Sequence, residues 1–143
     1  MLPEAIHALL VAEADVVAGI ATYDFGDVAE QPAVFTMESG VPEDAAYPCI
    51  YVQQVSAADF GCRDKRGGDV ALDVTLYGPR DRSVTEAALE DTARAVWSAL
   101  HRATLCLTGF SPWGCTAMLP AKTADPSGFP AYRVPVRARV LEV

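Results

Sequence analysis

The chain of 143 residues is 51% hydrophobic and 21% charged, with a formal net charge of -8 at pH 7. This length and composition are typical of a single folded domain spanning residues 1–143, and they exclude a disordered chain. No apolar run approaches the roughly 20 residues that cross a bilayer, and the start of the chain lacks the basic region of a signal peptide, so we expect a cytosolic protein with no membrane segment.

Charge is divided unevenly along the chain. Residues 1–61 contain ten Asp and Glu and no Lys or Arg, and all eleven basic residues follow. A net negative chain without a large basic cluster is a poor nucleic-acid binder, because cations are needed to displace the phosphate counterions. Two parts of opposite sign favour head-to-tail self-association, in which each subunit offers two different surfaces. The alternative is that the acidic part only keeps the protein soluble.

Residues 2–14 predict an N-terminal helix. Pro3 suits its first turn, where the missing amide costs no hydrogen bond, and Glu4 favours the positive end of the helix. His7 lies beside the apolar stripe and is predicted to face solvent. The helix is expected to end near residues 15–19, where valine and glycine replace better helix formers.

Residues 20–47 are predicted to be mostly loop, because prolines and glycines interrupt them repeatedly. Within them, residues 34–37 predict a short strand. A loop of this length is uncommon in a small domain unless it has a role, so we expect a contact surface here. Residues 49–55 predict a second strand, and the polar, glycine-rich residues 56–68 predict the long connection of a hairpin.

The next two elements predict the two halves of one core. In residues 70–77 apolar side chains alternate with polar or small ones, which is the period of a half-buried strand. Gly78 and Pro79 end this strand. Ser83 and Glu86 are spaced as a capping box, so a helix with one apolar stripe is predicted to start there and to run to residue 100.

The segment after this helix is rich in proline and glycine. Residues 115–119 predict a strand, and residues 121–129 predict a turn-rich link. Phe110 and Trp113 lie beside glycine and proline. They are either an exposed anchor for a partner or aromatic side chains folded over an edge of the core.

Residues 132–143 predict a closing strand. Its valines face one way, and three basic side chains face the other: Arg133, Arg137 and Arg139. Pro135 falls on the arginine face and has no amide, so one side of this strand is predicted to be incompletely paired. Asp73, on the strand at 70–77, is placed to pair with one of the arginines across the sheet. A salt-bridged solvent face and a subunit contact are the two interpretations of this surface.

The sequence contains no recognisable catalytic, metal-binding or cofactor motif. The four cysteines form no Cys-x-x-Cys pair and neither histidine lies beside one, which argues against zinc. We interpret them as small buried thiols, although Cys106 and Cys115 flank a loop and could approach each other. The phosphate-binding loop motif is absent from the basic cluster of Arg63, Lys65 and Arg66. We therefore expect no enzyme, no metal and no cofactor.

The order of these elements resembles that of the tail terminator, or tail completion, proteins of long-tailed bacteriophages and gene transfer agents. The likeness is carried by five segments: the helix with Leu9-Leu10, VPEDAAYPCIYV at 41–52, VALDVTLYG at 70–78, AVWSAL at 95–100 and YRVPV at 132–136. The resemblance implies an α+β fold, in which an antiparallel sheet of about four strands has two main helices packed on one face.

The resemblance also implies a structural virion protein. Six copies would form a homohexameric ring on the end of the finished tail tube, stop its polymerisation and offer the surface that joins the head. The partners would be other copies of the chain, the tail tube protein and a head–tail connector protein. DNA would pass through the channel without specific binding, which a net negative subunit allows. The protein would lie at the head–tail junction of the virion, and in the host cytoplasm during assembly.

Charged side chains and one aromatic are the candidates for a subunit or partner interface: Arg63, Lys65, Arg66, Asp73, Trp113, Arg133, Arg137 and Arg139. A head–tail connector or head-closure subunit is the alternative function within the same class. A small cytosolic enzyme or ligand-binding domain is the alternative from a different class, and only the structural functions require self-association.

Overall fold

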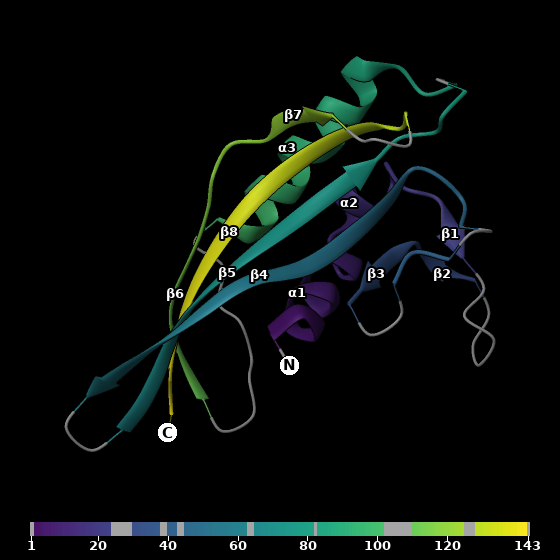
Figure 1. Ribbon diagram of the computed structural model, residues 1–143. Coiled ribbons are helices and arrows are strands. Elements are labelled where there is room, and N and C mark those ends of the chain that lie inside the picture. The colour runs from purple at the N-terminus through teal and green to yellow at the C-terminus, as the bar shows by residue number, and fades with distance from the viewer. Residues whose placement is uncertain are drawn as a thin grey trace.

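The computed structural model describes residues 2–23, 30–37, 40–42, 45–62, 65–81, 83–101, 110–124 and 128–142, and the side chains of 2–3, 57–67, 110–114, 124 and 140–142 lie outside this description. A long, twisted sheet forms the body of the protein, with the helices against one of its faces (Figure 1). The protein is therefore α+β, as the sequence predicts.

Six strands form the main sheet, in the order β3-β4-β5-β8-β6, and β7 also pairs with β8. Their bounds are Val34–Thr36 (β3), Cys49–Cys62 (β4), Lys65–Tyr77 (β5), Phe110–Ala117 (β6), Ala121–Ala124 (β7) and Pro130–Glu142 (β8). Two short strands, β1 (Thr22–Tyr23) and β2 (Gln31–Pro32), form a separate antiparallel pair.

The expected antiparallel sheet of about four strands is wrong in two respects. The sheet has six strands, and β3 runs parallel to β4. Strand direction depends on how the preceding segment approaches the sheet, which the pattern of side chains does not record. Residues 121–124, predicted to be part of a turn-rich link, form β7 because they lie along β8 and share its backbone hydrogen bonds.

The described residues contain three helices: α1 (Leu2–Val11), α2 (Ala14–Val17) and α3 (Glu86–Leu100). The predicted N-terminal helix is interrupted at Glu13, whose extended backbone precedes α2. The N-cap of α3 is Thr85 and not Ser83, because the Thr85 hydroxyl accepts a hydrogen bond from the amide of Ala88 at 3.2 Å. Ser83 instead donates its own amide to the carboxylate of Asp81.

The main core lies between the helices and one face of the sheet. Leu72, Val74 and Leu76 of β5 are buried there, as the two-residue period predicts. The apolar stripes of α1 and α3 pack against the same face through Ile6, Leu10, Leu89, Ala93, Val96 and Leu100. Removal of these side chains from water is the main favourable contribution to folding.

A second, smaller core lies on the opposite face of the sheet, near β3. Its buried members are Ala33, Phe35, Ala45 and Cys49. Successive residues of a strand point to opposite faces, so Val34 enters the main core and Phe35 enters the second. The ring of Tyr23 meets that of Phe35 edge-on, with centroids 5.3 Å apart. The described parts of residues 20–47, predicted to be mostly loop, thus contribute most of this core.

β4 and β5 form one long hairpin, in which residues 56–62 and 65–71 are paired strands. The prediction of a long connection over residues 56–68 is therefore wrong. A polar, glycine-rich sequence can pair here because the ladder is made of backbone hydrogen bonds, and β8 continues to pair with β5 as far as Gly67. With β6 and β8, the hairpin forms a distal end of the sheet that extends past the helices (Figure 1).

Gly19 approaches α3 so closely that no side chain fits. A Cβ at this position would lie 2.1 Å from Oγ1 of Thr92, a buried side chain whose hydroxyl donates to the carbonyl of Ala88. We predict that Gly19→Ala lowers the free energy of unfolding by about 1–3 kcal/mol, the usual cost of overpacking, in urea denaturation. Its effect should be smaller in a Thr92→Ala background, and a Gly19→Ala variant as stable as the wild type would contradict this contact.

Candidate assembly surface

The face of the sheet opposite the helices carries a ladder of charged side chains from β5 and β8. The register places Asp69 opposite Arg139 and Asp73 opposite Pro135. The guanidinium of Arg139 donates to both carboxylate oxygens of Asp69, at 2.7 and 3.0 Å. A guanidinium nitrogen of Arg133 lies 3.6 Å from the carboxylate of Asp73. The predicted pairing of Asp73 with an arginine across the sheet is confirmed.

The ion pairs of this ladder shift the pKa values of their own members. The hydrogen bonds from Arg139, with a smaller contribution from the charge of Arg137, hold the pKa of Asp69 below its usual range, and the same pair raises the pKa of Arg139. Because these side chains are largely exposed, their pairing contributes little to stability. It leaves an ordered charged surface that another molecule can reach.

Three of the remaining predicted interface residues, Lys65, Arg66 and Trp113, belong to the distal end of the sheet. Lys65 and Arg66 begin β5, and Trp113 lies where the register of β6 shifts, but their side chains are outside the described residues. Arg63 is outside the described residues altogether. The structure therefore gathers Asp73, Arg133, Arg137 and Arg139 on one face and leaves the other candidates as predictions.

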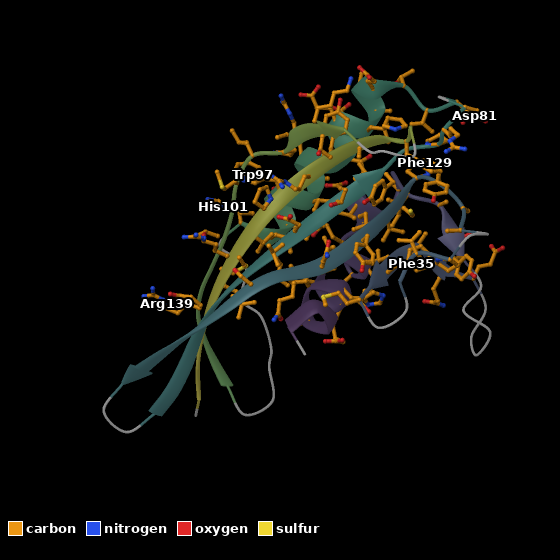
Figure 2. All side chains as sticks on the ribbon, in the orientation of Figure 1. Phe35, Asp81, Trp97, His101, Phe129 and Arg139 are labelled. Carbon is orange, nitrogen blue, oxygen red and sulfur yellow. The ribbon has the colours of Figure 1, made fainter. Side chains whose placement is uncertain are left out.

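The end of α3 closes the free edge of β6, a feature that sequence reasoning missed. The indole Nε1 of Trp97 donates to the carbonyl of Ala117 at 3.0 Å, and the amide of Ala117 donates to Nδ1 of His101 at 3.3 Å. The two rings stack with centroids 5.2 Å apart, and they lie together beside the sheet (Figure 2). His101 is thus an acceptor for a strand amide. The spacing of Trp and His, one helical turn apart, was the available signal.

The β6–β7 edge is interrupted opposite Pro135. β6 ends at Ala117 and β7 begins at Ala121. Between these two residues the edge contains one residue more than the facing segment of β8. The amide of Met118 still donates to the carbonyl of Pro135 at 2.9 Å. Pro135 cannot donate in return because it has no amide, so the ladder breaks here, and the predicted incomplete pairing of this strand is confirmed.

This interruption exposes two neighbouring apolar side chains. Met118 is 68% exposed and Leu119 is 67% exposed. An irregularity at a sheet edge commonly redirects side chains in this way.

The opposite edge of the sheet has its own irregularity, at Val55. β4 contains an extra residue between Gln54 and Ser56, and Val55 is 58% exposed. Met37 follows the end of β3 and is 50% exposed. Its Sδ accepts a hydrogen bond from the amide of Gln54 at 3.0 Å, so Met37 and Val55 lie at the same place on this edge.

The described thiols and histidines are structural. Cys49 and Cys115 are free and buried, and burial raises the pKa of both thiols, that of Cys49 to about 12. The thiol of Cys115 donates to the carbonyl of Leu100. His7, predicted to face solvent, is half-buried, and burial lowers its pKa while a hydrogen bond with the backbone of Val34 opposes that shift.

The described residues offer little for chemistry. An open hollow between α2 and α3 is lined by residues that include Asp15, Asp91 and Arg94. Among the residues that the structure describes, no three His, Cys, Asp or Glu side chains gather closely enough to hold a metal ion. In the same part of the chain, no helix is both long and apolar enough to cross a membrane.

The fold is one that is found in virions. A chain in the solved structure described as "Virion of native gene transfer agent (GTA) particle" matches with a TM-score of 0.71 and 21% sequence identity, over 98% of this chain and 94% of that chain. The profile of the family described as "Tail completion protein gp17" matches residues 4–141, and the chain belongs to this family. It is a structural protein of the virion tail, from a family that is not one of enzymes, and the resemblance drawn from its sequence is confirmed. No curated protein matches the chain.

The Arg139–Asp69 pair can be tested by titration. We predict that Arg139→Gln raises the pKa of Asp69 toward its ordinary value, because it removes the hydrogen bonds that favour the carboxylate. Measurement of side-chain carboxyl shifts by NMR as a function of pH checks this. Arg137→Gln is the matched control and should give a smaller rise, whereas an unchanged Asp69 in Arg139→Gln would show that the pair does not form in solution.

The buried thiols make a second prediction possible. In a Cys62→Ser/Cys106→Ser variant only Cys49 and Cys115 remain, and both should resist a thiol-specific disulfide reagent at pH 8 until the protein is unfolded, because their burial hinders both access and ionisation. The absorbance of the released thiolate measures the reaction. Rapid labelling of the folded variant would mean that the cores around these residues open easily.

Proposed function

We propose that this protein is a tail terminator. Six copies form a ring on the end of the tail tube, stop its polymerisation and present the surface to which the head is joined. The observation that carries this proposal is the match of residues 4–141 to the tail completion family. The likeness of the whole fold to a chain from a gene transfer agent virion supports it.

The shape and charge of the subunit suit a protein that acts by contact. The distal end of the sheet extends past the helices, so it is placed to reach a protein that the helical part does not touch (Figure 1). The charged ladder of β5 and β8 and the two exposed apolar pairs provide surfaces for neighbours. A net charge of -8 suits a ring through which DNA passes without being held, because like charges repel.

This proposal predicts an effect on tube length. When purified tail tube protein polymerises in the presence of this protein, elongation should stop early and the tubes should be shorter, because a capped end offers no site for the next tube subunit. Negative-stain electron microscopy would measure the length distribution and show added density at one tube end. A preparation of the same protein unfolded by heat is the control.

The same experiment separates terminator from connector. Unchanged tube lengths with no density at either end would overturn the terminator function. Binding to purified portal complexes in place of tubes would instead assign the protein to the head side of the junction, as a connector or head-closure subunit.

A further inference from the structure

Two pairs of exposed apolar side chains mark opposite edges of the sheet. Met118 and Leu119 lie at the β6–β7 edge, and Met37 and Val55 lie at the β3–β4 edge. In the part of the chain that the structure describes, these are the large hydrophobic side chains that are exposed. Large apolar side chains that are exposed together at two places indicate contacts with other proteins.

The two pairs lie close to one row of cross-strand partners. This row runs from edge to edge of the sheet: Ala117 of β6, Val136 of β8, Leu72 of β5 and Gln54 of β4. Met118 follows the residue at one end of this row and Val55 follows the residue at the other, on opposite sides of the row because β6 and β4 run in opposite directions. The two pairs therefore belong to the same region of the sheet and not to its distal end.

Backbone groups at both ends of this row are already occupied. The amide and carbonyl of Ala117 bond to His101 and Trp97, and the amide of Gln54 bonds to Met37. A neighbour therefore cannot extend the sheet by strand pairing at these positions without displacing those side chains. Contact at these positions is therefore made by side chains, and the exposed ones include the four large apolar residues.

Charge selects which edges meet. The β3–β4 edge is built from residues 1–61, which contain ten acidic residues and no basic one. The opposite edge is built from residues 62–143, which contain eleven basic and nine acidic residues, and Lys122 of β7 pairs there with Glu86 at 2.6 Å. Contact between unlike edges therefore joins the acidic part of the chain to the part with a slight positive balance, which is more favourable than contact between two acidic parts.

We propose that copies of this chain join head to tail, with Met118 and Leu119 of one copy packed against Met37 and Val55 of the next. This inference rests on the proposed ring and names the surfaces that build it. Because each copy uses two different surfaces, the contact is heterologous, and such contacts close into a ring when the rotation between neighbours allows it.

Two double variants test this contact, each with one edge made acidic. Met118→Asp/Leu119→Asp removes the apolar pair of the β6–β7 edge, and Met37→Asp/Val55→Asp removes that of the β3–β4 edge. All four side chains are at least half exposed, so both variants should fold, which circular dichroism and a thermal melt check. The control is Ser83→Asp/Ala87→Asp, which adds the same charge at two exposed positions by the start of α3.

Assembly is measured by sedimentation velocity in solution and by electron microscopy at tail tube ends. We expect the wild type and the control to assemble. Each edge variant alone should require at least a tenfold higher protein concentration to assemble. The decisive sample is an equimolar mixture of the two edge variants. It should form a heterodimer and stop there, because the mixture holds one intact pair of complementary edges.

Other outcomes overturn the inference in distinguishable ways. If both edge variants assemble as the wild type does, these edges are not the contact, and the proposed ring stands without it. If one edge variant dimerises by itself, its intact edge binds its own kind and the head-to-tail arrangement is wrong. If the wild type assembles neither in solution nor at tube ends, both the inference and the proposed function fail.

Discussion

The pairing of β5 with β8 is the constraint on which the rest of the structure depends. Its register places Leu72 opposite Val136 and Asp69 opposite Arg139, so one face of the sheet is apolar and the other carries ion pairs. A shift by one residue would move every side chain of one strand to the wrong face. The apolar face that the helices cover, the charged ladder and the row of partners that joins the two edges all depend on this register.

A missing backbone amide shapes one edge of that sheet. β8 is an interior strand, yet it contains Pro135, which cannot donate to the neighbouring strand. The edge strand therefore divides into β6 and β7 and turns Met118 outward, while Trp97 and His101 cover the backbone of Ala117. The result is an edge that resists unspecific strand addition but still offers apolar side chains, which suits a protein that must assemble only in one manner.

Residue patterns predicted the elements whose environment is decided locally. The alternation in residues 70–77 and in the described side chains of 132–139, the stripe of α3 and the pairing of Asp73 with an arginine are all confirmed. The errors lie in segments whose structure depends on contacts with residues far away in the sequence. Residues 56–62 and 65–68 are strand because β4 pairs with β5 and β5 also pairs with β8, and residues 121–124 are strand because they lie along β8. The second core was missed because it draws Phe35, Ala45 and Cys49 from separate places in a proline-rich segment.

The sequence by itself determined the α+β class, the two faces of the central strands and the family, because side-chain periods and recurring segments are properties of consecutive residues. It also determined that acidic and basic residues occupy different parts of the chain. Only the tertiary structure decided the parallel direction of β3, the cover over Ala117 and the position of the two exposed apolar pairs near one row across the sheet. The physical reason is that strand order and register arise from contacts between residues far apart in the chain, and no local pattern encodes which of several compatible strands lies beside which.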